Sequence, residues 1–125
     1  NLKKIDSVFY KGPIYNEQRK KEIFKYSDVM ILPTKSENFG YVILESLRSG
    51  LPVITTNKTP WEIIQTTNSG WIIDDKINDL ENILKELNTI SKEEFLKKSQ
   101  NSLELSKNFF WDKIIDKYIY LYSNL

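Results

Sequence analysis

The chain has 125 residues, of which 40% are apolar and 28% charged, and its 18 Lys and Arg nearly balance its 17 Asp and Glu. This composition predicts one soluble globular domain, and the even charge argues against a nucleic-acid-binding protein, which needs clustered basic residues. Cysteine and histidine are absent. A disulfide framework, a cysteine metal site and the Ser-His or Cys-His arrangements of nucleophilic catalysis are therefore excluded for this chain.

Four short apolar runs, each bounded by turn residues, predict strands at residues 8–10, 29–32, 52–55 and 71–73. These runs lack the alternation of a half-exposed sheet, which is typical of strands buried on both faces. Patterns typical of helices lie between them, at residues 17–26, 39–49 and 59–68. Asn16 is the expected cap of the first helix, and Thr59 followed by Pro60 and Glu62 predicts the start of the third.

After residue 74 the pattern changes to helices alone, expected at residues 77–87, 91–107 and 110–122. Ser91 and Glu94 form a predicted capping box at the start of the second of these helices. Strands that alternate with helices predict an α/β fold with an open parallel sheet and helices on both faces. We therefore expect a single domain over residues 1–125, with βα units in 1–74 and an all-helical segment in 75–125.

The segment after the second predicted strand holds the main candidate site. Residues 34–40 follow that strand at the carboxyl edge of the sheet, where ligands bind in open α/β folds. A helix is expected to begin near Gly40, and the first amides of a helix have no intrahelical partner and carry the positive end of its dipole. The amides of residues 38–41 are thus candidates to bind a phosphate, a hydroxyl or a carboxylate. The alternative is that Gly40 only permits a tight turn.

Two acidic residues, Glu37 and Glu45, stand eight positions apart around this helix start. Glu45 lies in a largely apolar helix, so it is either exposed along a narrow polar stripe or it has a partner, because burying an unpaired carboxylate is costly. A carboxylate can accept two adjacent hydroxyls, as in a ribose diol. Glu37 is either a partner of the helix dipole or an acceptor for ligand hydroxyls, and Asn38 is an alternative N-cap.

The two acids belong to a longer pattern of residues that resembles a known protein family. The pattern consists of Leu32, Pro33, Ser36, Glu37, Phe39, Gly40, Glu45, Gly50, Pro52, Val53 and Ile54. It resembles the C-terminal domain of GT-B glycosyltransferases, family 4, also described as glycosyl transferases group 1. Glu37 and Glu45 match the Glu-x7-Glu motif of that family, and the resemblance covers about residues 8–74.

The resemblance implies a Rossmann-like half of a GT-B fold and a retaining glycosyltransferase. Such an enzyme moves a hexosyl group from a UDP- or GDP-sugar to an acceptor hydroxyl, here in the synthesis of a surface or capsular polysaccharide or of lipopolysaccharide. It needs no cofactor and no metal. Glu37 would lie beside the donor hexose as the candidate catalytic residue, and Glu45 would accept the ribose hydroxyls. Donor hydroxyls and the diphosphate would be bound by the amides of Asn38, Phe39, Gly40 and Tyr41.

The resemblance also implies that this chain is part of a longer protein. The family's Arg and Lys that hold the donor diphosphate lie upstream, and the acceptor site lies in an N-terminal domain. We expect that missing domain, the nucleotide-sugar donor and a saccharide or lipid-linked acceptor as partners, and no nucleic acid. The chain alone is expected to show no turnover and weak binding of nucleotide sugars. The expected location is cytoplasmic, and association of the parent protein with the inner face of the membrane stays open.

One other class of protein is consistent with the same residues. A non-catalytic nucleotide- or sugar-binding module, or an interaction module, would keep the fold without the reaction. The presence of both Glu37 and Glu45 argues against it, and only the aromatic last helix favours an interaction role.

Overall fold

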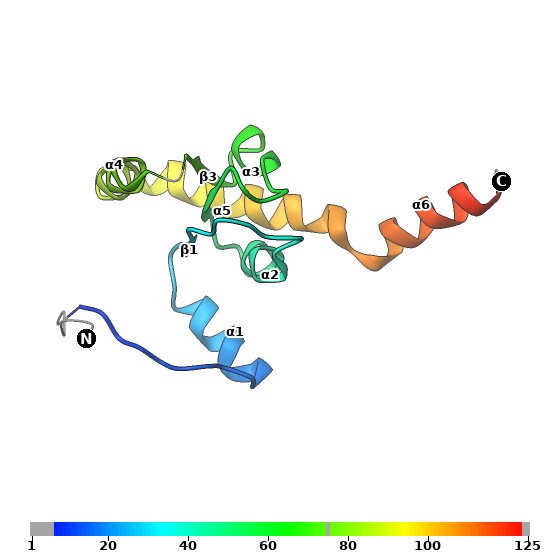
Figure 1. The fold of residues 1–125 in the computed structure, drawn as a ribbon, viewed down its shortest axis with the longest axis horizontal. Helices are drawn as coiled ribbons and strands as arrows, with labels where there is room; N and C mark the ends of the chain where they lie inside the picture. Colours follow the sequence, from blue (N-terminus) through cyan, green and yellow to red (C-terminus); the bar gives the residue numbers. More distant parts are fainter. Residues whose placement is uncertain (1–6, 75, 124–125) are drawn as a thin grey trace.

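The computed structural model describes residues 7–74 and 76–123 of the chain (Figure 1). Its sheet has three parallel strands in the order β1 (Met30–Leu32), β2 (Val53–Thr56) and β3 (Gly70–Ile73). Crossovers through helices join the strands, as parallel pairing requires. The predicted α/β class with a parallel sheet is confirmed.

The helices follow the predicted order along the chain. They are α1 (Glu17–Lys25), α2 (Tyr41–Arg48), α3 (Ile63–Thr66), α4 (Ile77–Leu87), α5 (Lys92–Ser106), the short 3-10 helix η1 (Lys107–Phe109) and α6 (Trp111–Ser123). The Asn16 side chain caps α1 by accepting from the Arg19 amide at 2.9 Å, as predicted. The predicted capping box of Ser91 and Glu94 opens α5. In Figure 1, α5 runs along the sheet and α6 projects beyond it. None of the helices in the described residues is long and apolar enough to cross a membrane.

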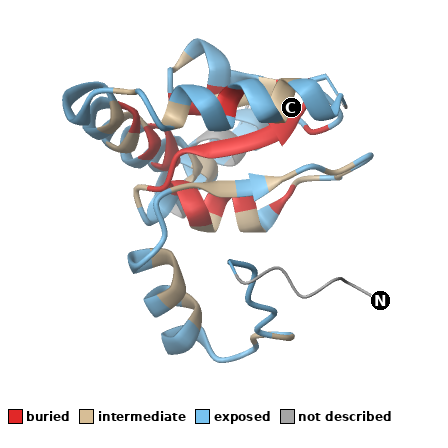
Figure 2. Ribbon diagram, turned by 90° about the vertical axis from the view of Figure 1, so that its left-hand side faces the viewer, coloured by how far each residue is buried: buried red, intermediate tan, exposed pale blue. Residues whose placement is uncertain are grey.

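The core has two parts because successive residues of β2 point to opposite faces of the sheet. On one face, Val53 packs with residues of α2, α3 and α5. On the other face, Ile54 packs with Ile73 of β3 and Ile83 of α4. β2 is buried at all four positions and lies between the two helix layers (Figure 2). Helices therefore cover both faces of the sheet, as the sequence predicts.

Two predictions about strands are wrong. Residues 8–10 form no strand in the described part of the chain, and Val8, Phe9 and Tyr10 are 64%, 77% and 87% exposed. A strand needs a neighbour for its amides and carbonyls, and the described sheet begins at β1, which lies away from this segment (Figure 1). The residues of β1 are not buried on both faces either, because Ile31 is 39% exposed on the face where α4 packs against β3.

The third helix also begins later than predicted. Thr59 does not cap it, because its hydroxyl donates to the Thr56 carbonyl at 3.2 Å and closes the turn after β2. The Trp61 side chain packs in the core and is 1% exposed. The helix α3 therefore starts only at Ile63, with Glu62 at its N-cap.

The packing of α5 against the sheet can be tested with two leucines on the same helix. Leu105 is 3% exposed in the core, whereas Leu96 is 50% exposed. We expect Leu105→Ala to lower the free energy of unfolding by about 2–5 kcal/mol, because it leaves a cavity in a packed core. The control, Leu96→Ala, should lower it by less than about 1 kcal/mol. Urea unfolding measures both, and equal losses would contradict the docking of α5 on this face.

Candidate functional site

The loop between β1 and α2 is held by the neighbouring strand. From β2, Thr55 donates its hydroxyl to the Leu32 carbonyl at 3.0 Å, and Thr56 donates to the Thr34 carbonyl at 2.6 Å. Both acceptors lie where the chain leaves β1. The start of the loop is therefore fixed at the carboxyl edge of the sheet, which is the edge where open α/β folds bind ligands.

The loop ends at Gly40, which has a left-handed backbone with φ +76° and is the N-cap of α2. A Cβ atom at this position would lie 3.1 Å from both Glu37 Cγ and Ile43 Cδ1 and 3.4 Å from Trp61 Nε1. Glycine is thus required by both its conformation and the close approach of its neighbours. This geometry supports the alternative that Gly40 permits a tight turn. It also brings Glu37 close to the start of the helix.

The N-terminus of α2 has backbone groups available to a ligand. At this helix end, the Ile43 and Leu44 amides donate to the Gly40 carbonyl at 2.9 and 3.4 Å. The amides of Tyr41 and Val42 precede these bonds, and no side chain caps this helix end in the described part of the chain. Asn38 is therefore not the cap. Such an end favours an anion or a hydroxyl acceptor, because its amides point outward with the positive end of the dipole.

A cluster of aromatic side chains packs against the loop before α2. The Trp61 indole Nε1 donates a hydrogen bond to the Phe39 carbonyl. The centroid of the Phe39 ring lies 5.4 Å from that of Trp61 and 4.9 Å from that of Tyr41, and Phe109 lies 4.9 Å from Trp61. The Phe39 side chain thus packs in the protein, so a ligand would meet its backbone. No pattern in the sequence indicates this hydrogen bond.

The predicted site residues fall into two groups. The first group lies around the N-terminus of α2 at Gly40 and consists of Glu37, Asn38, Phe39 and Tyr41. Of these, Asn38 is exposed and Tyr41 is 75% exposed. Glu45 lies five residues further along α2, which corresponds to about 7.5 Å of helix rise. The structure therefore places all six residues on one loop and one short helix, with the two acids at different heights along it.

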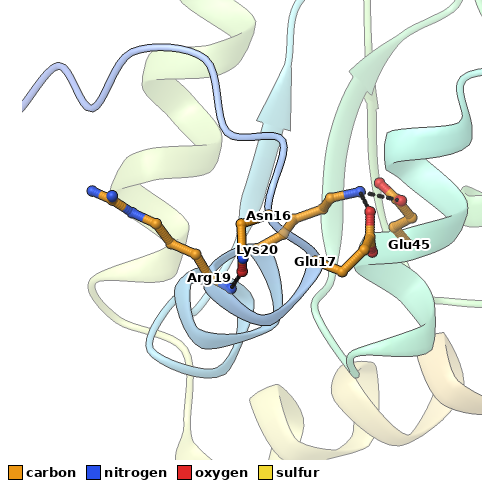
Figure 3. Close-up of polar contacts among 5 residues, drawn as sticks. All are labelled: Asn16, Glu17, Arg19, Lys20 and Glu45. Carbon is orange, nitrogen blue, oxygen red and sulfur yellow. Dashed lines mark hydrogen bonds and ion pairs between the residues drawn. The ribbon is translucent and has the colours of Figure 1, made fainter.

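Glu45 has a partner that the sequence did not reveal. Its Oε1 accepts a hydrogen bond from Lys20 Nζ of α1 at 2.7 Å (Figure 3), and its side chain keeps 37% of its surface exposed. The hydrogen bond to Glu45, followed by the one to Glu17, raises the pKa of Lys20 above its ordinary value. Glu45 and Lys20 line a pocket of about 410 Å³, and Glu37 is not among the lining residues. Both alternatives for Glu45, exposure and a partner, thus hold in part.

A comparison with models of protein families shows which family the chain belongs to. The profile of the family described as "Glycosyl transferases group 1" matches residues 1–111 of the chain. The chain belongs to this family. The resemblance to this family seen in the sequence is therefore confirmed.

Several curated glycosyltransferases resemble this family member. An uncharacterized glycosyltransferase of Haemophilus influenzae is 24% identical over 99 residues, which cover 76% of this chain and 28% of that protein. The N-acetyl-alpha-D-glucosaminyl L-malate synthase of Bacillus anthracis is 27% identical over 130 residues, covering 100% of this chain and 32% of that protein. The O-antigen biosynthesis glycosyltransferase WclY of Escherichia coli is 53% identical over 30 residues, covering 24% of this chain and 8% of that protein.

Among solved structures, the chain is similar to WaaG, a glycosyltransferase involved in lipopolysaccharide biosynthesis. The TM-score is 0.61 with 25% sequence identity, and the match covers 69% of this chain and 24% of WaaG. The likeness supports the GT-B glycosyltransferase domain. The chain spans about a quarter to a third of the length of WaaG and of the two relatives that match most of it.

The support of the loop by Trp61 can be tested by comparing Trp61 with Trp71, whose indole also donates a hydrogen bond. Trp61→Phe removes the donor to the partly buried Phe39 carbonyl and should lower the free energy of unfolding by about 1–3 kcal/mol. It should also shift the backbone amide NMR signals of residues 38–41. Trp71→Phe is the control, because its Nε1 donates at 3.1 Å to Glu86 at an exposed position. Unchanged loop signals in Trp61→Phe would contradict the support role.

Proposed function

We propose that the intact protein is a retaining glycosyltransferase that moves a hexosyl group from a nucleotide-sugar donor to an acceptor hydroxyl. The observation that carries this proposal is the start of α2: an uncapped helix N-terminus at the carboxyl edge of the sheet, with Glu37 against Gly40 and Glu45 exposed further along the helix. Membership of the glycosyl transferases group 1 supports the reaction class.

The donor fits this arrangement group by group. The amides of residues 38–41 would bind sugar hydroxyls and the diphosphate, since helix N-termini stabilise negative charge. Glu45 would accept the ribose hydroxyls, because a carboxylate is an acceptor that can take two neighbouring donors. A UDP- or GDP-sugar has its ribose and its hexose on opposite sides of the diphosphate. The separation of Glu45 from the helix start suits such an extended ligand.

The catalytic role proposed for this site is electrostatic. Amides fixed by the left-handed Gly40 and by the hydrogen bond from Trp61 to Phe39 would stabilise the departing nucleoside diphosphate without reorganising. Glu37 would orient the hexose and stabilise the positive charge that develops on it. We assign no covalent nucleophile, and the proposed reaction uses no cofactor and no metal.

The remaining parts of the reaction are assigned to the rest of the intact protein. The chain covers a minor part of its relatives, so an N-terminal domain would carry the acceptor site and further cations for the diphosphate. This chain alone would then bind donors weakly and turn nothing over. Because WaaG and WclY are named for lipopolysaccharide and O-antigen biosynthesis, we propose a saccharide or lipid-linked acceptor of a cell-surface polysaccharide. A cytoplasmic location completes the proposal.

The first test addresses the ribose role of Glu45. In the intact protein, Glu45→Gln should weaken the binding of UDP or GDP by about tenfold or more, because it removes a charge-assisted hydrogen-bond acceptor. Saturation-transfer NMR should show the loss at the ribose protons. Glu93→Gln, at an exposed position of α5, is the control and should bind as the wild type does. Unchanged ribose signals in Glu45→Gln would rule out this role.

The second test addresses the catalytic role of Glu37. Glu37→Gln should lower kcat by about 100-fold, because it removes an interaction that strengthens in the transition state, whereas KM for the donor should change little. The measurement is transfer or hydrolysis of UDP-glucose, UDP-N-acetylglucosamine and GDP-mannose by the intact protein, with the same control variant. Absence of activity with a broad donor panel would overturn the proposed function itself.

A further inference from the structure

A lysine of α1 reaches across to the acid that is proposed to bind ribose. Lys20 Nζ lies 2.7 Å from Glu45 Oε1 and 2.9 Å from Glu17 Oε1, so one ammonium bridges a carboxylate of its own helix and one of α2 (Figure 3). The neighbouring Arg19 points away from Glu45 in the same view. The sequence separation of Lys20 and Glu45 is 25 residues, so only the packing of α1 beside α2 creates this contact.

The contact leaves Glu45 able to bind a ligand. The bond from Lys20 uses one carboxylate oxygen, Oε1, and the pair lines an open pocket of about 410 Å³ together with Phe24 and Arg48. The side chain of Lys20 is 25% exposed and that of Glu45 is 37% exposed. Since each carboxylate oxygen can accept more than one hydrogen bond, the bound Lys20 still leaves room for two hydroxyl donors.

The charge of Lys20 matters for an anionic ligand. A diphosphate and a free carboxylate repel each other, so an unpaired Glu45 would oppose the ligand whose ribose it is proposed to hold. The ammonium offsets that charge, and the hydrogen bond to Glu45 raises the Lys20 pKa, so the ammonium stays protonated at neutral pH. The bond also restricts the Glu45 side chain, which lowers the entropy lost when a ligand binds.

We propose that Lys20 is a positioning residue for the donor: it orients the Glu45 carboxylate and offsets its charge, so that Glu45 accepts the ribose hydroxyls of an anionic nucleotide. This inference rests on the proposed function. A role in stability alone is a poor explanation, because partly exposed ion pairs contribute little to folding.

The test is calorimetric binding of UDP, GDP, uridine and guanosine to the intact protein. Lys20→Met should weaken the binding of the nucleoside diphosphate, UDP or GDP, that the wild type binds by about tenfold. It should weaken the binding of the matching nucleoside by a smaller factor. Lys20→Arg should restore most of the affinity, because a guanidinium also bonds a carboxylate. Arg19→Met, which removes the same charge from the next position, should bind as the wild type does. In a Glu45→Gln background, Lys20→Met should have no further effect, since it acts through Glu45.

The outcomes separate this inference from the proposed function. A wild type that binds neither UDP nor GDP overturns the proposed function and the inference with it. If the wild type binds and Lys20→Met binds equally well, only the inference fails. Tighter binding by Lys20→Met would show that Lys20 blocks Glu45. A loss of affinity confined to the diphosphate would show that Lys20 contacts the phosphate directly. Either result overturns the positioning role.

Without any ligand, the Glu45 carboxylate NMR signal should respond to Lys20→Met and not to Arg19→Met.

Discussion

The hydrogen bond from the Trp61 indole to the Phe39 carbonyl is the constraint on which the candidate site depends. It ties the loop after β1 to a side chain that is 1% exposed, just before the left-handed Gly40 turns the chain into α2. Thr55 and Thr56 hold the other end of the loop. A backbone fixed at both ends presents its amides in one arrangement, and such preorganisation is what binding and electrostatic catalysis require.

The site that results has two chemically different regions on one helix. The N-terminus of α2 offers uncapped amides and the side chain of Glu37, whereas Glu45 further along offers a carboxylate already paired with Lys20. The first region suits anionic and hydroxyl groups, and the second suits hydroxyl donors attached to an anionic ligand. A nucleotide sugar combines these groups in one molecule, and for this reason we propose it as the ligand of both regions. The same helix buries Ile43, Leu44 and Leu47 in the core, so the site is built on a rigid element.

Elements with local signals were predicted well, and elements that depend on distant partners were not. Asn16 and the pair of Ser91 and Glu94 mark helix starts through bonds within one turn, so the sequence alone predicts α1 and α5 closely. The apolar run at residues 8–10 looks like a strand, but a strand exists only where a neighbour pairs with it. Thr59 has the signature of a cap, but burial of Trp61 two residues later decides that turn instead.

By itself, the sequence determined the family, the parallel α/β fold and the positions of Glu37, Gly40 and Glu45, because these depend on residue types at fixed spacing along one loop and helix. Only the tertiary structure decided what those residues contact. The Trp61 bond to Phe39 spans 22 residues and the Lys20 bond to Glu45 spans 25. Such contacts depend on how α1, α2 and the segment before α3 pack in space, and a change of a few ångströms in that packing would remove them. No local pattern of residues encodes a distance of that kind.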